Sequence, residues 1–211
     1  MNYKNNANLY LFGKGELAIY CAEKYLESSE KENLIIIPVK PEPRWTDSLI
    51  NWANENNVTT LDFGNISQNK ISHDSIGISI YFDKILKNDL INNFHKIFNI
   101  HNSPLPKYRG VNPINWALKN GENQHGVTLH LIDEGIDTGP IVDQEIFNIN
   151  QDMEVIDVYN LCIENGKKLI DNNLMKLDVA SGVTQSIDNI SYYSKKDYDF
   201  LGDRKEFRRK I

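Results

Sequence analysis

Short apolar runs alternate with amphipathic stretches along the first hundred residues of the chain. Residues 34–39 are apolar throughout, which is typical of a strand buried on both faces of a parallel sheet. Residues 16–26 instead carry apolar side chains at the spacing of one helix face. The same criteria predict further strands over 8–12, 58–61, 76–82 and 97–101, and further helices over 48–57 and 86–94.

The pattern changes after residue 101. Residues 113–119 predict a helix, and residues 127–132 and 141–149 predict two strands for which antiparallel pairing is one option. A long amphipathic segment follows over residues 153–176, and the chain from Ser191 onward is polar, aromatic and charged.

This order of elements indicates an α/β fold with a doubly wound, mostly parallel, Rossmann-like sheet flanked by helices. The sequence contains no internal repeat and no long linker. We therefore expect one domain over residues 1–190, followed by a C-terminal tail over residues 191–211.

The composition is that of a soluble globular protein with a mild negative charge. Of 211 residues, 40% are hydrophobic and 25% are charged. The chain has 23 Lys and Arg against 29 Asp and Glu, and the net charge of −6 argues against non-specific nucleic-acid binding. Cys21 and Cys162 lie far apart in sequence, which argues against a disulfide scaffold and a cysteine-rich zinc site.

The start of the chain does not resemble a signal peptide, because Gly, Lys and Glu interrupt its short apolar runs. No stretch approaches the roughly 18 consecutive apolar residues of a membrane helix. We therefore expect a cytoplasmic protein that binds neither a membrane nor nucleic acid.

The segment Gly13-Lys14-Gly15 follows the first predicted strand and opens the first predicted helix. Its pattern, G-x-G-x-x-A, lets backbone amides approach a phosphate at a helix N-terminus. A nicotinamide enzyme also needs an acidic residue at the end of the second strand, where this chain has Lys40. Three interpretations stay open: a nicotinamide dinucleotide, another phosphate-bearing ligand, and a purely structural turn.

Asn99 and His101 project from the same face of a predicted strand, because residues two apart in a strand share a face. They lie at its C-terminal end, where open α/β sheets bind their ligands. An amide beside an imidazole can polarise a carbonyl and move a proton. The loop that follows carries Pro104 and Pro106, which restrict its conformation.

Asp137 lies in a glycine-bracketed loop between the two later strands. A tight turn there can direct its carboxylate back toward His101, which would orient the imidazole and favour its protonated form. The alternative is a structural role, in which Asp133 or Asp137 closes an Asx-turn.

Together these strings resemble the folate-dependent formyltransferase family. Its pattern is Asn-x-His, a Leu-Pro-x-Tyr-Arg-Gly loop, Gly-Val-Thr and a Gly-Ile/Leu-Asp-x-Gly loop, and the chain matches each element. The resemblance is clear over residues 76–149 and rests on element order alone over residues 8–75. It implies a formyltransferase-type fold and the transfer of a formyl group from the cosubstrate 10-formyltetrahydrofolate to an amine.

The resemblance also implies roles for individual residues. Asn99 and protonated His101 would stabilise the oxyanion, and Asp137 would hold His101 and help to move protons. The formyl donor would lie beside the loops 81–86 and 133–137, and no metal is implied. The residues expected to contact the donor are Lys84, Ile85, Leu86 and Asp133.

For the amine acceptor, the stretches 112–116, 132–139 and 190–195 resemble sugar N-formyltransferases. These enzymes act on a nucleoside-diphosphate-linked amino-dideoxy sugar, here expected to be of the dTDP-4-amino-4,6-dideoxyglucose type, for surface polysaccharide. The residues expected to contact this acceptor are Lys14, Pro106, Tyr108, Arg109 and Trp116. Trp116 also fits an ordinary core position on a helix.

Other acceptors stay open. Phosphoribosylglycinamide formyltransferase has a similar length, but its Gly-x-Gly-Ser-Asn loop differs from Gly13–Leu17. The methionyl-tRNA enzyme has a second, basic domain, and formyltetrahydrofolate hydrolase has a regulatory domain; this sequence shows neither. A non-catalytic ligand-binding homologue is a further alternative.

Three remaining features carry less weight. His125, His130 and Asp133 are close in sequence, but their spacing fits no common zinc signature. Many family members dimerise, so a homodimer is suggested, although no feature of the sequence establishes it. The basic residues of the tail are more typical of a solvated surface than of a site; they are Arg204, Lys205, Arg208, Arg209 and Lys210.

Overall fold

The computed structural model describes residues 8–201, so the basic residues of the tail lie outside the described part. The chain divides into two compact units. Unit 1 comprises residues 8–99 and 170–180, and unit 2 comprises residues 100–169 and 181–201. Among the described helices, none is long and apolar enough to span a bilayer.

Unit 1 contains the first strands and helices of the chain. Its strands are β1 (Leu9–Gly13), β2 (Leu34–Pro38), β3 (Thr59–Thr60), β4 (Ile76–Ile80) and most of β5 (Lys96–His101). Its helices are α1 (Gly15–Leu26), α2 (Leu49–Glu55) and the single turn α3 (Asn88–Ile91), with 3₁₀ turns η1 (Lys31–Asn33), η2 (Phe63–Gln68) and η3 (Leu174–Lys176).

Unit 2 contains two short strands, two long ones and the remaining helices. They are β6 (Arg109–Gly110), α4 (Pro113–Lys119), β7 (Gln124–Leu131), β8 (Ile141–Asn148), β9 (Tyr192–Tyr193) and η4 (Lys195–Leu201). Helix α5 (Val155–Asn173) runs from unit 2 into unit 1. Seven strands form one sheet in the order β3-β2-β1-β4-β5-β7-β8, and β6 pairs with β9 in a second sheet.

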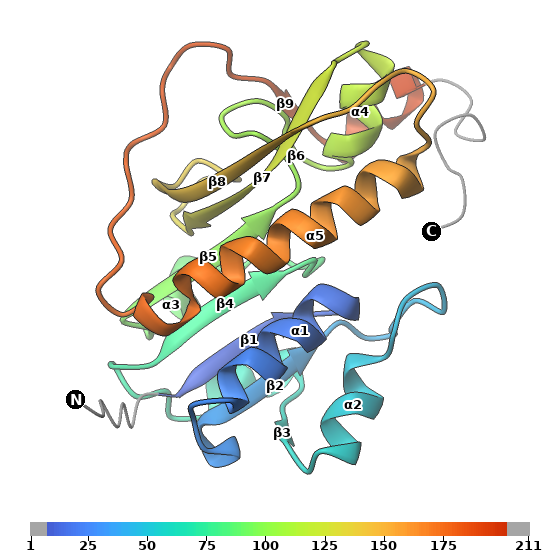
Figure 1. Ribbon diagram of the computed structural model, residues 1–211. Helices are drawn as coiled ribbons and strands as arrows, with labels where there is room; N and C mark the ends of the chain where they lie inside the picture. Colours follow the sequence, from blue (N-terminus) through green and yellow to red (C-terminus); the bar gives the residue numbers. More distant parts are fainter. Residues whose placement is uncertain (1–7, 202–211) are drawn as a thin grey trace. The chain divides into compact units, whose positions relative to one another are not determined.

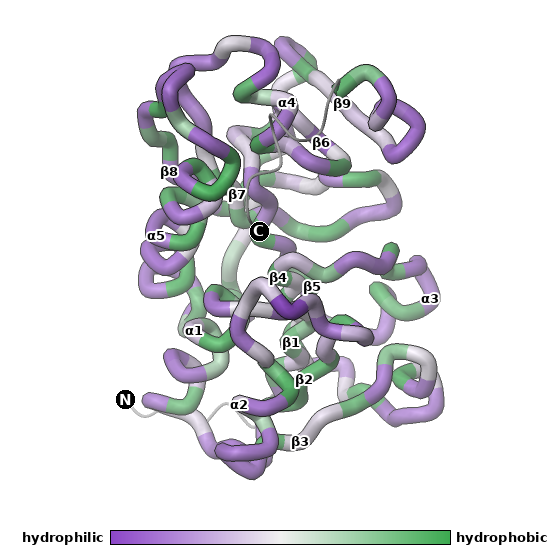
Figure 2. Tube along the Cα trace, turned by 90° about the vertical axis from the view of Figure 1, so that its right-hand side faces the viewer, coloured by the Kyte–Doolittle hydropathy of each residue, from purple (hydrophilic) through white to green (hydrophobic). Residues whose placement is uncertain are grey.

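The centre of unit 1 is a group of strands that are apolar on both faces. Every residue of β1, β2 and β4 is buried, and Figure 2 shows the hydrophobic trace along β1 and β2. β1 pairs in parallel with both β2 and β4. Helix α1 packs on these strands (Figure 1). Its buried face consists of Gly15, Leu17, Ala18, Cys21, Ala22 and Tyr25.

The sheet is doubly wound, because the chain moves outward from β1 to β2 and β3 and then returns to place β4 on the other side of β1. Gly13 at the end of β1 is aligned with Ile80 at the end of β4, and the amide of Lys14 donates to the Ile80 carbonyl at 3.3 Å. The loops after β1 and β4 therefore start side by side, at the position where doubly wound sheets bind ligands.

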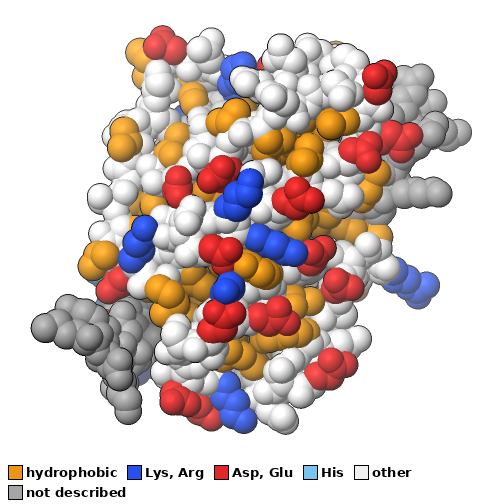
Figure 3. All heavy atoms as spheres, in the orientation of Figure 1, with side chains coloured by type: hydrophobic (Ala, Val, Ile, Leu, Met, Phe, Trp, Pro, Cys, Tyr) orange, Lys and Arg blue, Asp and Glu red, His pale blue; other side chains and the backbone are white. Residues whose placement is uncertain are grey.

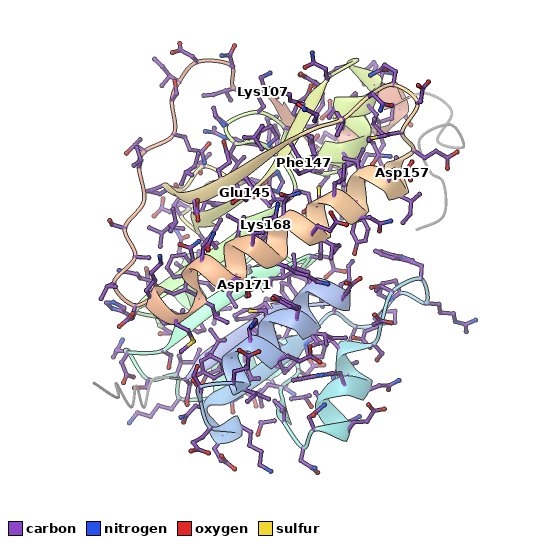
Figure 4. The ribbon with its side chains drawn as sticks, viewed as in Figure 1. Lys107, Glu145, Phe147, Asp157, Lys168 and Asp171 are labelled. Carbon is purple, nitrogen blue, oxygen red and sulfur yellow. The ribbon has the colours of Figure 1, made fainter. Side chains whose placement is uncertain are left out.

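Strands β7 and β8 pair antiparallel, which was one of the options that the sequence left open. The predicted amphipathic segment forms α5, whose exposed polar row includes Asp157, Lys168 and Asp171 (Figure 4). On the face shown in Figure 3, acidic and basic side chains are interspersed. The α/β, mostly parallel fold class predicted from the sequence is confirmed.

One predicted helix is much shorter than expected. The sequence predicts a helix over residues 86–94, but α3 ends at Ile91. Leu86, Leu90 and Phe94 are buried and supplied the helical spacing, whereas Asn92 and Asn93 after Ile91 are poor helix formers. The apolar spacing is satisfied by one helical turn and a further turn in which Phe94 donates its amide to the Ile91 carbonyl.

We predict that Gly13→Ala destabilises unit 1. A Cβ at Gly13 would lie 2.3 Å from the Ile80 carbonyl oxygen, which belongs to the neighbouring strand and cannot move aside cheaply. Overpacking of this kind costs about 1–3 kcal/mol, so urea denaturation should show a lower free energy of unfolding. Gly64→Ala is the control, because its Cβ would meet only the Asp62 side chain, at 3.1 Å. Equal stability of the two variants would contradict the prediction.

Candidate active site

Strand β5 carries Asn99 and His101 on one face, as predicted from strand alternation. The His101 side chain is buried, with the residue only 8% exposed. Its Nε2 lies 2.9 Å from the Tyr108 carbonyl oxygen, which can only accept, so Nε2 carries a proton in this contact. The other ring nitrogen, Nδ1, lies 3.6 Å from Asp137 Oδ2.

Asp137 brings its carboxylate to a place that is nearly closed to water. The residue adopts φ +54°, the left-handed conformation that Asp tolerates better than most residues, and its side chain is 12% exposed. Oδ2 accepts a hydrogen bond from the Gly110 amide at 2.8 Å, and Oδ1 lies 3.6 Å from His130 Nε2. The sequence predicted the approach of Asp137 to His101, and the structure places the two side chains together.

The electrostatics of Asp137 are set by opposing effects. Burial alone raises the pKa of the Asp137 carboxyl. The His101 and His130 imidazoles and the Gly110 amide outweigh burial, and the net pKa lies well below its usual range. Asp137 therefore stays ionised at neutral pH, and its negative charge faces both imidazoles.

His130 is a second imidazole at the site, and the sequence analysis did not assign it there. Its Nδ1 lies 2.8 Å from the Leu131 carbonyl oxygen, so Nδ1 is the donor and Nε2 faces Asp137. The residue is 2% exposed. The available signal was a histidine inside the strand predicted over residues 127–132, where most of the other residues are apolar.

The backbone of residues 108–110, which include β6, holds both catalytic candidates. Tyr108 offers its carbonyl to His101, and Gly110 offers its amide to Asp137. β6 is in turn paired with β9, through Arg109 N to Ser191 O and Val111 N to Tyr193 O, both at 2.9 Å. A side chain at position 110 would collide with β9, because a Cβ there would lie 2.1 Å from the Tyr193 carbonyl oxygen.

Tyr108 and Trp116, predicted to contact the acceptor, belong to an aromatic stack. Tyr193 lies on Trp116 with ring centroids 4.0 Å apart, and on Tyr108 at 6.0 Å. Trp116 is 4% exposed, which matches the core position that the sequence left open. The Tyr108 hydroxyl donates to Glu122 at 2.7 Å. Burial raises the pKa of Tyr108, and this hydrogen bond raises it further. Tyr193, in the predicted tail, was not assigned from the sequence.

Arg109 and Pro106 lie in the same loop. The Arg109 Nε and Nη2 donate to Gln185 Oε1 at 3.1 and 2.7 Å, and Gln185 was not assigned from the sequence. The Pro106 carbonyl accepts from the Ser191 amide at 3.4 Å. Lys107, labelled in Figure 4, forms an ion pair with Glu122 at 3.5 Å.

Asp133 takes the structural role that the sequence left open. Its Oδ1 accepts from the Gly135 amide at 3.1 Å and from the Thr138 hydroxyl at 2.6 Å, which closes an Asx-turn. The turn shapes the loop that ends at Asp137. Contact of Asp133 with a formyl donor stays a prediction.

In unit 1, the structure brings Lys14 close to the loop after β4. The Lys14 Nζ lies 5.9 Å from the Trp45 ring centroid. Burial lowers the pKa of Lys14, and Asp83 in the loop after β4 opposes this effect. Tyr81, the first residue of that loop, adopts φ +56°, a conformation that is uncommon for a bulky residue and often found at functional sites.

The same loop carries the three residues predicted to contact the formyl donor. Ile85 is 74% exposed, an unusual position for a large apolar side chain, whereas Leu86 is buried. The Lys84 Nζ lies 5.6 Å from the Phe63 ring centroid. No group of three or more metal-ligating side chains was found within residues 8–201.

Comparison with known proteins defines the class to which this fold and site belong. A family model described as "Formyl transferase" matches residues 67–174, slightly more than half of the chain. This range contains Asn99, His101 and Asp137. The chain belongs to the formyl transferase family.

Two solved structures of sugar N-formyltransferases share 32% sequence identity with the chain and superpose with a TM-score of 0.80. One is WlaRD, a sugar 3N-formyl transferase crystallised with dTDP and 5-N-formyl-THF; the match covers 92% of this chain and 71% of WlaRD. The other is the N-formyltransferase of Helicobacter canadensis in complex with folinic acid and dTDP-3-aminofucose, with coverage of 90% and 72%.

Among curated proteins, the methionyl-tRNA formyltransferase of Thermodesulfovibrio yellowstonii is 44% identical over 88 residues. The match covers 41% of this chain and 29% of that relative. A second one, from Finegoldia magna, is 29% identical over 146 residues, with coverage of 61% and 46%. The chain therefore spans less than half the length of these two curated relatives.

We predict that His125 makes unit 2 sensitive to acid. Its ring is fully buried, its Nε2 lies 2.8 Å from the Asn102 carbonyl oxygen, and burial lowers the pKa of His125 from 6.5 to about 4. The unfolded chain binds this proton more readily than the folded one, so stability falls as the pH drops from 6.5 to about 4. The full effect corresponds to roughly 3 kcal/mol.

Urea denaturation of the native protein and of His125→Phe between pH 7 and pH 4 measures this contribution. The variant should lose less stability over that range than the native protein does. Phe147→Leu is the control, because Phe147 packs edge-on against the same ring at 6.0 Å but carries no proton. Its stability deficit should be independent of pH. A His125→Phe variant with the native pH dependence would refute the assignment.

Proposed function

We propose that this protein transfers a formyl group from 10-formyltetrahydrofolate to the amino group of a nucleotide-linked amino sugar. The observation that carries the proposal is the contact between buried His101 and ionised Asp137. His101 lies two residues after Asn99 on β5. The two sugar N-formyltransferases at 32% identity support the sugar acceptor and the folate donor.

The geometry suits acyl transfer to an amine. The amine attacks the formyl carbon, and the Asn99 amide donates a hydrogen bond to the oxyanion that forms, while protonated His101 stabilises it by its positive charge. Because His101 Nε2 donates to Tyr108, the proton nearest Asp137 is the one on Nδ1. Asp137 holds the imidazole and helps to move the proton that the amine loses, directly or through water. That proton passes to the folate nitrogen as the bond between this nitrogen and the formyl carbon breaks, so tetrahydrofolate leaves and the formyl group stays on the amine.

For the donor, the proposal assigns contacts to Lys84, Ile85, Leu86 and Asp133. In the structure, the exposed Ile85 side chain offers apolar surface, and the turn at Tyr81 offers backbone groups in a fixed conformation. These features fit a flat, largely apolar ring with hydrogen-bonding edges. Formyltetrahydrofolate is a substrate of the reaction, and the proposal requires no metal.

For the acceptor, the proposal assigns direct contacts to Lys14 and Arg109, whose positive charges suit a diphosphate. Pro106, Tyr108 and Trp116 would shape the surrounding loop, since both aromatic side chains are buried. The proposed sugar is of the dTDP-4-amino-4,6-dideoxyglucose type, for surface polysaccharide, in a cytoplasmic enzyme with a homodimer as the suggested assembly. A 3-amino sugar is the direct competitor, because one relative at 32% identity is a sugar 3N-formyl transferase and the other was crystallised with dTDP-3-aminofucose.

Methionyl-tRNA is the second candidate acceptor. The observation in its favour is the 44% identity to a curated methionyl-tRNA formyltransferase over 88 residues. The net charge of −6 is unfavourable for a large RNA ligand.

The test is a mass-spectrometric transfer assay with purified protein and 10-formyltetrahydrofolate. The acceptors are dTDP- and UDP-linked 3- and 4-amino sugars, glycinamide ribonucleotide and methionyl-tRNA. We expect a formyl mass gain on one nucleotide sugar. A gain only on methionyl-tRNA or glycinamide ribonucleotide would reject the sugar acceptor. Loss of formyl from the folate without transfer to any acceptor would indicate a hydrolase.

We predict that His101→Ala and Asp137→Ala each lower the turnover of this transfer by roughly 10²–10⁴-fold, the usual contribution of one acid–base group. Circular dichroism should show that both variants are folded. His73→Ala is the control, because His73 is exposed in unit 1, before β4. Near-native turnover of either site variant would remove that residue from the catalytic group.

A further inference from the structure

Gln185 is a buried polar residue in a segment of unit 2 that has no regular secondary structure. It is 8% exposed, and its side-chain amide makes four hydrogen bonds. Oε1 accepts from two nitrogens of Arg109, at 3.1 and 2.7 Å. Nε2 donates to the carbonyl of Asp137 at 2.9 Å and to that of Gly139 at 2.8 Å.

This hydrogen-bond set determines the orientation of the amide. A reversed amide would direct its NH₂ group at the Arg109 guanidinium, which has no acceptor, and its oxygen at two carbonyls, which have no donor. All the hydrogen-bonding groups of the Gln185 side chain are therefore used in one arrangement. That arrangement joins β6 to the loop that carries Asp137.

The backbone around Gln185 is itself anchored. Two residues earlier, Val183 exchanges two hydrogen bonds with Ile141 at the start of β8, at 2.9 and 2.7 Å. The Gly182 backbone lies close to Pro140, since a Cβ at Gly182 would be 2.6 Å from the Pro140 Cβ. The segment thus lies against Pro140 and Ile141, which directly follow Gly139. These contacts define the position of the Gln185 amide.

We propose that Gln185 is a positioning residue for Asp137, an inference that rests on the catalytic role given to Asp137 under the proposed function. The amide holds the loop backbone at Asp137 and Gly139 in register with Arg109 on β6. Gly110, the next residue of β6, donates to the Asp137 carboxylate. Gln185 therefore determines where that carboxylate lies between His101 and His130, without touching it.

The charged groups around Asp137 make this role measurable. His101 faces it from β5 and His130 from β7, Asp133 lies in the same loop, and Arg109 on β6 is linked to the Asp137 backbone through Gln185. The pKa of Asp137 lies below its usual range because the imidazoles and the Gly110 amide are close. When the loop is released, these distances increase and the carboxyl should titrate nearer to its usual pH, about 4.

The first test is the titration of Asp137 in the unliganded protein, followed by NMR with ¹³Cγ-labelled aspartate. The variant is Gln185→Leu, and Gln124→Leu is the control because Gln124 is an exposed glutamine at the start of β7. We expect the Asp137 midpoint to rise in Gln185→Leu alone. A native midpoint in that variant would overturn the proposal, whatever the acceptor of the enzyme is.

The second test separates the acceptor function of the Gln185 amide oxygen from the donor function of its nitrogen. Gln185→Glu keeps an acceptor for Arg109 but cannot donate to the carbonyls of Asp137 and Gly139. If Gln185 positions Asp137, Gln185→Glu and Gln185→Leu both lose roughly 10–10²-fold in kcat, with the KM for 10-formyltetrahydrofolate unchanged, as expected for a small misplacement of a reacting group. Native kcat in Gln185→Glu would show that only the Arg109 contact matters and would overturn the proposal.

The two tests distinguish failure of this inference from failure of the proposed function. A raised Asp137 midpoint in Gln185→Leu supports the positioning role even if the native protein formylates none of the acceptors. A native midpoint together with normal sugar formylation overturns the positioning role alone.

Discussion

The arrangement of unit 2 depends on one constraint, the ionised carboxylate of Asp137 in a place nearly closed to water. Removing a carboxylate from water is costly unless charged or polar partners replace the lost hydration. Two imidazoles and one backbone amide do so here. Each partner is held by a backbone carbonyl or by strand pairing, so the partners cannot move away together. This explains how the pKa of Asp137 falls below its usual range although burial acts in the opposite direction.

The same constraint accounts for the contacts that hold β6 in place. Tyr108, directly before β6, supplies a carbonyl to His101, and Gly110 of β6 supplies an amide to Asp137, yet two residues of strand have little stability of their own. Their position depends on β9, about eighty residues later in the chain, and on the stack of Tyr193 with Trp116. The first residues of the predicted tail therefore support the segment that holds His101 and Asp137.

Local patterns were sufficient for the elements whose burial is uniform. The apolar runs of β1, β2 and β4 and the Asn99–His101 alternation on β5 depend only on neighbouring residues, and they were predicted. The contacts of Gln185 and Tyr193 could not be predicted in this way, because their partners Arg109 and Trp116 lie more than seventy residues away in the sequence. His130 was visible as a polar residue in an apolar strand, but the strand alone does not say which carboxylate it faces.

The Leu-Pro-x-Tyr-Arg-Gly loop shows why a recognisable string need not be a string of substrate contacts. The Tyr108 ring packs in the aromatic stack while its carbonyl orients His101, and Gly110 is required by its close approach to β9 as well as by its amide. The Arg109 side chain is half-buried, and its Nε and Nη2 donate to Gln185 Oε1. In this loop, the backbone at positions 108 and 110 holds His101 and Asp137, and the side chain between them is held by Gln185.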